Sequence, residues 1–246
     1  MTCWPKLKKI LEKIIQLNTI NTFEHSEIKW KPNYGIELQT VNENGRKYVT
    51  PEGKFSSITT ILGHRDRYKW AAWRKKIGAE EANRITRHAT TRGTKVHGMA
   101  EDYLNNKEIN LKEEMPHHVQ SFNVIKKVCD QHIQRVYAQE VPLYSIDLKT
   151  AGRVDCIGSF DNELSIIDFK TSGRVKEESE ISNYFMQECA YAHMFEEGTG
   201  IPISQLVTIM VVDNDPNPIV FKQRYEDWID KLREEIKYYY DDINRL

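Results

Sequence analysis

The chain of 246 residues is long enough to bury one sizeable core, and its 39% hydrophobic and 29% charged residues are ordinary for a globular protein. No apolar run approaches the roughly 18–20 residues of a membrane-spanning helix, which argues against an integral membrane protein. The net charge of −1 does not by itself indicate a nucleic-acid partner, so any basic surface must be local.

Four widely scattered cysteines contain no Cys-x-x-Cys pair, which argues against a zinc ribbon and favours reduced thiols. The first 20 residues interleave lysines with aliphatic side chains, a pattern typical of an amphipathic helix. They lack a signal-peptide core. Glu12, and the absence of arginine before Arg46, argue against a mitochondrial transit peptide. We expect this helix to pack on the protein rather than on a membrane, and we expect a cytoplasmic location in a bacterium or a phage-infected cell.

Residues 23–50 favour extended structure, with a hairpin turn at Asn44-Gly45 and a second turn at residues 51–53. The sequence therefore predicts a small β module, which we interpret as a scaffold, with a wedge or lid as the alternative. We expect residues 1–55 to form an N-terminal helix and β-hairpin extension packed on a main domain of residues 56–246.

Ser56 or Ser57 can cap a helix, and residues 64–95 are helical in pattern and locally basic. Ten positive side chains face three negative ones in this run. The positive residues are Arg65, Arg67, Lys69, Arg74, Lys75, Lys76, Arg84, Arg87, Arg92 and Lys95. Trp70 and Trp73 lie among them. A solvated helix face is the ordinary interpretation, but the local imbalance favours a surface that binds a phosphate backbone.

His97 and Glu101 are four residues apart and share a helix face, which by itself indicates no more than a surface pair. A helix is predicted from about His117 to Tyr137. Glu140 then begins a short strand in which Pro142 indicates an edge or a bulge.

A hairpin spans Gly152–Lys170 and turns at Asp161-Asn162. A two-residue turn makes Phe160 oppose Glu163 and, counting back, makes Asp155 oppose Asp168, with Cβ atoms roughly 4.5–5.5 Å apart. Like charges at that separation destabilise a sheet, so this register predicts a cation between the two carboxylates. The period of two places Lys170 beside Asp168 on one strand face.

A helix is predicted from about Glu180 to Gly198, with Gln187 and Tyr191 on one face. A buried strand at residues 205–213 and a last helix from about Tyr225 follow. This order of elements predicts an α/β or α+β fold with a mixed central sheet flanked by helices.

Three motifs together resemble the PD-(D/E)XK nuclease core: the hairpin with Asp155 and Asp-Phe-Lys, the upstream helix Arg-Gly-x-x-x-His-x-x-x-Glu, and the downstream Gln-x-x-x-Tyr. The likeness is to the RecB-type branch, and most to the mitochondrial genome-maintenance exonuclease and its phage-encoded relatives. The matching motifs span about residues 45–213. The resemblance implies a restriction-endonuclease-like core and a metal-dependent exonuclease that hydrolyses single-stranded DNA from free ends. Such an exonuclease would act in DNA replication, repair or recombination, or in phage DNA metabolism.

The family motifs carry over onto particular residues. Asp155, Asp168 and Lys170 match its catalytic residues, and His97, Asp155, Asp168 and the Phe169 carbonyl match its metal ligands. The ions implied are one or two Mg²⁺ or Mn²⁺. No cysteine follows Cys189, so the iron–sulfur cluster of some relatives is not expected. Glu101 and Glu140 would lie beside the ligands. The expected substrate-binding residues are Arg74, Lys75, Lys76, Arg92, Thr171, Gln187 and Tyr191.

Two alternatives remain open. One is a structure-specific or duplex-cutting endonuclease on the same core, and the other is a catalytically silent DNA-binding module. The intact Asp-x-Lys argues against the silent module, which has no need of opposed carboxylates. The expected partner is single-stranded DNA with free ends, with no membrane and no evident obligate protein partner.

Overall fold

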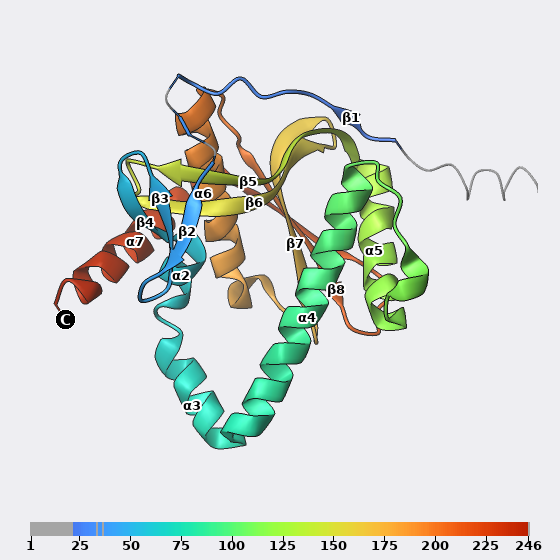
Figure 1. Cartoon of the computed structure of the whole chain (residues 1–246), viewed down its shortest axis with the longest axis horizontal. Coiled ribbons are helices and arrows are strands. Elements are labelled where there is room, and N and C mark those ends of the chain that lie inside the picture. The colour runs from blue at the N-terminus through green and yellow to red at the C-terminus, as the bar shows by residue number, and fades with distance from the viewer. Residues whose placement is uncertain (1–21, 33, 36, 246) are drawn as a thin grey trace, which may run out of the picture.

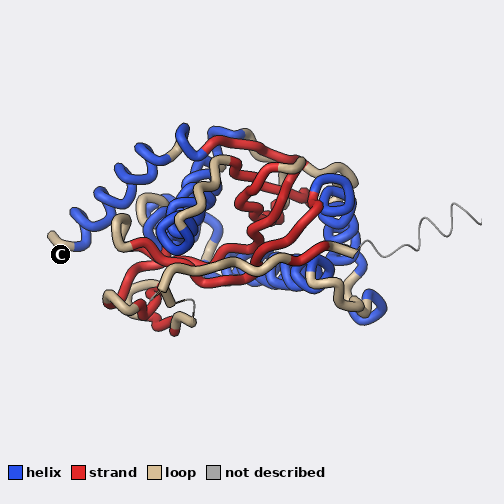
Figure 2. The backbone as a smooth tube through the Cα atoms, turned by 90° about the horizontal axis from the view of Figure 1, so that it is seen from above, coloured by secondary structure: helices blue, strands red, loops and turns tan. Residues whose placement is uncertain are grey.

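A mixed β-sheet runs through the molecule and carries helices on both faces (Figures 1 and 2). The computed structural model describes residues 22–32, 34–35 and 37–245, so the expected N-terminal helix lies outside the described residues. The strands are β1 (Glu24–His25), β2 (Gln39–Asn42), β3 (Arg46–Thr50), β4 (Gly53–Ser57), β5 (Ile133–Ser145), β6 (Thr150–Phe160), β7 (Glu163–Ser172), β8 (Gln205–Val212) and β9 (Ile219–Arg224). The helices are α2 (Ile58–Gly63), α3 (Arg67–Ile77), α4 (Ala79–Leu104), α5 (Pro116–His132), α6 (Ser182–Thr199) and α7 (Ile229–Ile243), with short 3₁₀ turns at Leu111–Glu113, Glu178–Glu180 and Tyr225–Asp227.

The sheet combines antiparallel and parallel pairs in the order β2-β3-β4-β6-β7-β8-β9, with β5 paired to β6 and β1 to β5. β6 and β7 are antiparallel, whereas β7 and β8 are parallel and joined by the crossover helix α6. Every residue of β8 is buried, because strands flank it and helices cover both its faces. The predicted fold class, a mixed central sheet flanked by helices, is confirmed.

The hairpin of β6 and β7 has the predicted register. Asp161 and Asn162 form its two-residue turn with φ of 51° and 66°, as a type I′ turn requires. Phe160 pairs with Glu163, and the ladder continues as far as Cys156 and Ile167. The next pair in this register would be Asp155 and Asp168, and there the two strands separate.

The β module of β2, β3 and β4 extends the same sheet. β4 runs parallel to β6, with Ser56 paired to Thr150 and Ser57 paired to Ala151. Ser57 also caps α2 by accepting a hydrogen bond from the backbone N–H of Thr60. The module is therefore held by backbone pairing to the strand that carries Asp155.

Two apolar clusters fill the space between the sheet and the helices. One packs α4 and α5 against one face of the sheet, and includes Val96, Ile125, Ile167 and Val207. The other packs α2, α6 and α7 against the opposite face. Successive side chains of β7 point to opposite faces of the sheet, so they face α4 and α6 in turn.

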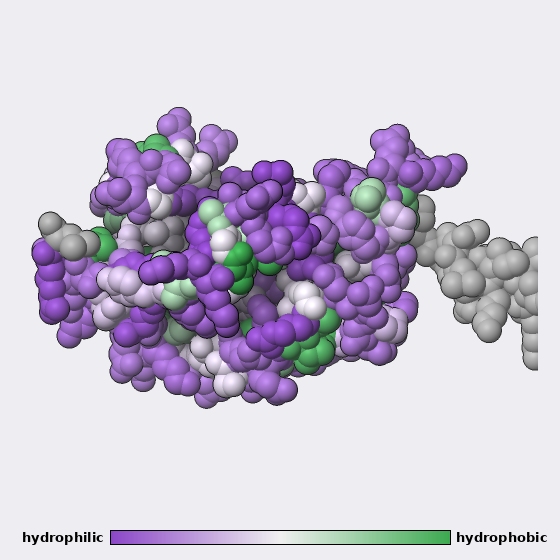
Figure 3. Space-filling model, turned by 90° about the horizontal axis from the view of Figure 1, so that it is seen from below, coloured by the Kyte–Doolittle hydropathy of each residue, from purple (hydrophilic) through white to green (hydrophobic). Residues whose placement is uncertain are grey.

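The helices α3 and α4 form a V that projects from the body (Figure 1). Gly78, with φ of 87°, makes the sharp turn between them, a conformation that favours glycine. α3 has no buried residue, and α4 buries mainly its second half, from Arg92 onward. We call residues 67–91 the arm. Figure 3 views the molecule from the side of the arm's tip and shows a mainly hydrophilic surface.

The base of the arm is tied to the last helix. His64 contacts Asp242 of α7 at 2.9 Å, and the Arg67 guanidinium donates to the same carboxylate at 2.8 Å. Arg65 forms a third ion pair with Glu235 at 2.6 Å. These bonds join segments about 170 residues apart in the chain.

The helix expected to reach Tyr137 ends instead at His132, and that boundary was wrong. The segment from Ile133 is rich in β-branched and aromatic residues, and it gains a long antiparallel ladder with β6, which outweighs its weak helical pattern. None of the helices that the structure describes has the length and apolar character to cross a membrane.

Candidate functional site

Asp155 lies at the point where β6 separates from β7. Its Oδ2 accepts a hydrogen bond from the backbone N–H of Phe169 at 3.0 Å, in place of the next backbone bond of the ladder. The carboxylate is thereby fixed in the gap between the strands. The predicted register thus brings Asp155 to the start of the Asp168-Phe169-Lys170 motif.

Asp168 is fully buried on the face of the sheet that α6 covers. Its Oδ1 accepts a hydrogen bond from the Gln187 side-chain amide of α6 at 3.2 Å. Its Oδ2 has no hydrogen bond of normal geometry and is paired with the Lys170 ammonium. Burial raises the pKa of Asp168 to about 6 despite Lys170, and the Asp155 charge adds to that increase.

Lys170 lies beside Asp168 on the same strand face, as predicted. Burial lowers the pKa of its ammonium, but the Asp168 and Asp155 carboxylates outweigh burial, and the net pKa is raised. In this arrangement Lys170 is a cation that can donate hydrogen bonds and stabilise negative charge.

His97 reaches the Asp155 carboxylate from α4. Its Nδ1 lies 3.3 Å from Asp155 Oδ2, and its ring meets the Phe169 ring edge to face at 6.2 Å between centroids. The His97 side chain keeps 28% of its surface exposed. The cluster is therefore open to solvent on the α4 side.

Glu140 joins this acidic group from β5. Its backbone has a left-handed φ of 48°, a local irregularity within the continuous strand β5. Burial, together with the nearby charges of Asp155 and Glu101, raises the pKa of Glu140 to about 7. The structure thus places Glu140 within electrostatic reach of both Asp155 and Glu101.

Gln187 and Tyr191 share a face of α6, as expected, and differ in exposure. The Gln187 amide donates to the Tyr191 hydroxyl at 3.2 Å as well as to Asp168. Tyr191 is only 2% exposed, and a Cβ at Gly152 would come within 2.6 Å of its ring. Tyr191 therefore acts on anything in the site through the orientation of Gln187.

The remaining expected substrate-binding residues lie in three settings. Thr171 is half-buried and faces α4 near Gly93. Arg92 is 5% exposed and its guanidinium is paired with Asp213, so this placement does not support the expected contact with substrate. Three of the expected residues lie on α3 and are exposed, and they are Arg74, Lys75 and Lys76.

Five of the ten basic residues in the run 64–95 form ion pairs. Each paired residue has an acidic partner within the protein, and these residues are Arg65, Arg67, Arg84, Arg92 and Lys95. The other five have no ion pair within the described part of the chain, and they are Lys69, Arg74, Lys75, Lys76 and Arg87. All five are exposed and lie on the arm.

Glu188 is a residue that the motif analysis did not identify. It is fully buried, and its Oε1 accepts a hydrogen bond from Thr208, which is paired with Asp168 across β7 and β8. Burial, followed by the Asp168 charge, raises its pKa well above the ordinary range, which favours the protonated form. An acid inside the apolar stretch Met186–Met194 was the signal that could have identified it.

The donor set at the hairpin fits a hard divalent cation. Asp155 and Asp168 offer carboxylate oxygens, and the Phe169 carbonyl is a further oxygen close by, as Mg²⁺ prefers. His97 would add an imidazole, which suits Mn²⁺. The convergence of Asp155 on the fully buried Asp168, whose Oδ2 has the Lys170 ion pair but no normal hydrogen bond, is the structural observation that favours such an ion.

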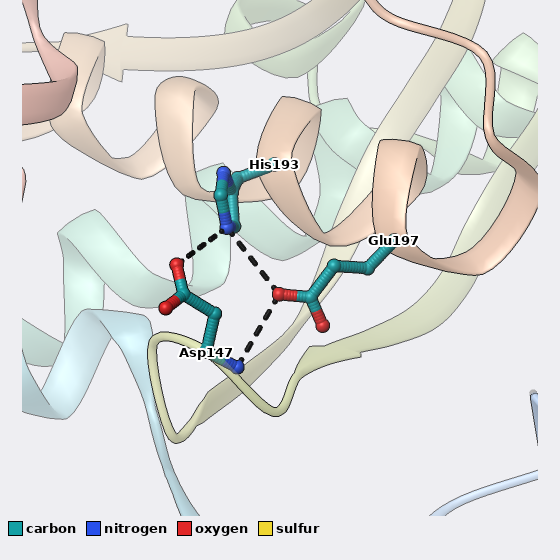
Figure 4. Close-up of side chains that lie close together, drawn as sticks. All are labelled: Asp147, His193 and Glu197. Atoms are coloured by element: carbon teal, nitrogen blue, oxygen red, sulfur yellow. Dashed lines mark hydrogen bonds and ion pairs between the residues drawn. The ribbon is translucent and has the colours of Figure 1, made fainter.

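A second group that could hold a metal ion lies elsewhere on α6 (Figure 4). The His193 Nε2 is 3.0 Å from an Asp147 oxygen and 3.3 Å from a Glu197 oxygen. Each of these atoms already has protein partners, since Arg233 donates to Asp147 at 2.6 Å and Ser145 donates to Glu197 at 2.5 Å. A hydrogen-bonded network joining the β5–β6 turn to α6 and α7 accounts for this group without a metal.

Residues 111–245, more than half of the chain, match the family model described as PD-(D/E)XK nuclease superfamily. The match includes Asp155, Asp168, Lys170 and the Gln187 helix, whereas His97 and the arm precede it. A search of curated proteins found no matching relative.

Proposed function

The chain belongs to the PD-(D/E)XK nuclease superfamily, and on that premise we propose that it is a metal-dependent deoxyribonuclease that degrades single-stranded DNA from free ends. The observation that carries this proposal is the juxtaposition of Asp155, Asp168 and Lys170 where β6 and β7 separate. A catalytically silent DNA-binding module has no use for a buried carboxylate of raised pKa at that point.

The metal would be held by Asp155, Asp168 and the Phe169 carbonyl, with His97 in or beside the ligand set. A bound Mg²⁺ or Mn²⁺ supplies charge stabilisation on the phosphate and a more acidic water. Gln187 and the Phe169 N–H orient the two carboxylates. Lys170, as an ammonium, would stabilise negative charge that develops on the phosphate oxygens.

The preference for single strands is supported by the arm. α3 carries the exposed ring of Trp70 and four of the five unpaired basic residues, and Arg87 of α4 is the fifth. Backbone charge and base stacking are the two contacts that unpaired strands offer without sequence preference. The resemblance of its motifs to those of RecB-type exonucleases supports a role in DNA replication, repair or recombination, or in phage DNA metabolism.

The test is cleavage of end-labelled linear single-stranded DNA in Mg²⁺ or Mn²⁺, with EDTA as the blank. Wild-type protein should shorten the labelled strand progressively, and Asp168→Asn should not, because it removes a ligand charge. Cleavage of blunt duplex at a comparable rate would instead support a duplex-cutting endonuclease. Equal behaviour of the wild type and Asp168→Asn would refute catalysis at this site.

A further inference from the structure

A cavity of about 760 Å³ lies between the α2–α3 segment and the start of α6. Gln187 forms one end of its lining, and the same Gln187 amide contacts Asp168. The cavity therefore opens beside the acidic centre, on the α3 side of the arm. Its size is in the range of pockets that hold small organic molecules.

Two aromatic rings line this cavity from different elements. Trp70 of α3 is 56% exposed, although aromatic rings of that size are usually buried, and its only ring neighbour among the described residues is Trp73. Tyr184 of α6 is half-buried, and the Lys170 ammonium lies 5.1 Å from its ring centroid. One wall of the cavity is thus shared with the proposed catalytic lysine.

The charges of the lining favour an anion. Lys176 donates a hydrogen bond to the Tyr184 hydroxyl at 2.8 Å, and Lys69 has no ion pair with any described residue. Glu180, one of the two acids of the lining, is neutralised by its ion pair with Arg174. The lining thus keeps two ammonium groups, those of Lys69 and Lys176, and a single carboxylate without an ion pair to Arg174, that of Asp66. The rings of Trp70 and Tyr184 line the same cavity.

We propose that this cavity binds one unpaired nucleotide of the DNA strand next to the nucleotide at the metal centre. Its base packs against Trp70 and Tyr184, and its phosphate is held by Lys69 and Lys176. The proposal rests on the single-strand substrate proposed above and adds a site for it. A base within a duplex is stacked and paired, so only an unpaired nucleotide can present its face to these rings.

Binding without cleavage tests this proposal separately from the nuclease activity. The probe is fluorescein-labelled hexathymidylate in EDTA, followed by anisotropy, with an abasic hexamer of the same charge as the second probe. Trp70→Ala should weaken hexathymidylate binding about tenfold, the scale of one lost base–aromatic contact, and Trp70→Phe should restore most of it. The abasic hexamer should bind the wild type more weakly than hexathymidylate does. Its own affinity should be the same for Trp70→Ala and Trp70→Phe.

The control is Tyr68→Ala, which removes another exposed aromatic ring of α3 that does not line the cavity. Lys176→Ala should lower the salt dependence of binding by about 0.7 in log–log slope, whereas Lys107→Ala, in the loop after α4, should not. Unchanged affinity in both Trp70→Ala and Lys176→Ala would overturn the site. So would equal binding of the abasic and normal hexamers by the wild type. Loss of cleavage with binding intact would refute the proposed nuclease and leave this site standing.

Discussion

Lys170 and Asp168 form a buried pair whose members have different expected roles. Asp168 can ligate a cation, whereas an ammonium cannot, so Lys170 must act on the substrate or on the attacking water. The raised pKa of Lys170 keeps it charged in the metal-free protein. That charge state fits a residue that stabilises anionic phosphate.

Replacing Lys170 by Ala should separate catalysis from metal binding. We expect cleavage to fall by at least about 100-fold, the scale of losing one donor to developing negative charge, while Mn²⁺ still binds. Calorimetric titration with Mn²⁺ and a cleavage assay on the same preparation measure both. Lys149→Ala in the β5–β6 turn is the control. Undiminished cleavage by Lys170→Ala would remove Lys170 from the mechanism.

Metal binding should appear as stability, because an ion that binds only the folded state stabilises it. At 100 times its Kd, Mn²⁺ should contribute about 2.7 kcal/mol, which corresponds to a rise in Tm of about 5–10 °C for a chain of this length. The wild type and Lys170→Ala should show this rise, and Asp168→Asn should show little of it. A rise in Asp168→Asn equal to that of the wild type would locate the ion elsewhere, with the Asp147, His193 and Glu197 group as the next place to examine.

Glu140 should make the metal-free protein less stable as pH rises. Its pKa is about 7 in the folded protein against about 4.5 when unfolded, so the folded state holds the extra proton between these values. Its contribution is therefore lost as pH rises from about 4.5 to about 7, and it stays absent above that. Glu140→Gln should unfold at higher urea than the wild type at pH 8 in EDTA. Its stability should also fall less steeply between pH 5 and pH 7. Parallel pH profiles for the two proteins would show that Glu140 titrates normally.

At the level of single residues, the sequence was informative wherever the two-residue period of a strand determines which side chains lie together. The two-residue turn and the alternation of a strand were enough to bring Asp155 and Asp168 together and to put Lys170 beside them. Glu188 and the left-handed Glu140 were not accessible in this way, because burial by a distant helix and a local irregularity in a strand depend on tertiary packing. The ion pair of Arg92 with Asp213 likewise joins segments whose contact no local pattern encodes.

The arm is the element whose surface bears most directly on substrate. Five of its basic side chains lack acidic partners within the described structure, and α3 buries none of its residues. The sequence located this basic run but overestimated its free charge, because the partners of Arg65 and Arg67 lie on α7, far away in the chain. It also did not place the break at Gly78, where a glycine ends one helix and starts the next.

Reversing the charge of Arg74, Lys75 and Lys76 to Glu should weaken single-strand binding and flatten its dependence on salt. Each lost phosphate contact removes about 0.7 from the log–log slope, so three would remove about 2. Titration of labelled single-stranded DNA at several salt concentrations in EDTA measures this. The matched control reverses Lys107, Lys112 and Lys127, which are exposed and lie outside the arm. An unchanged slope in the arm variant would make this run an ordinary solvated helix face.

At the scale of the whole molecule, the arm and the body enclose the approach to Asp155 from two sides. α4 brings His97 to the site, and on the α3 side the cavity lined by Trp70 and Gln187 adjoins Asp168. If a strand must pass between these walls, a free end can enter and a closed circle cannot. The topology of the substrate therefore tests the arrangement of the molecule.

Linear single-stranded DNA should be degraded to short products in Mg²⁺ or Mn²⁺, whereas a single-stranded circle of the same sequence should survive. The comparison is made at equal enzyme by gel electrophoresis over time. Linearising the circle with a single cut restores the free ends and should restore degradation. Comparable cutting of the intact circle would mean that the approach is open, and the endonuclease interpretation would then replace the exonuclease one.

The ion pairs from His64, Arg65 and Arg67 to α7 have a consequence for the lifetime of the enzyme on its substrate. They make the last helix the support to which the base of the arm is fixed, although α7 contributes none of the proposed catalytic residues. Asp242→Asn together with Glu235→Gln would loosen that support without touching the carboxylates of the site. The chemistry of one cleavage would then keep its rate, while the number of nucleotides removed before the strand escapes would fall. Processivity in this protein would thus be set by surface ion pairs at the C-terminal helix, and catalysis by the hairpin.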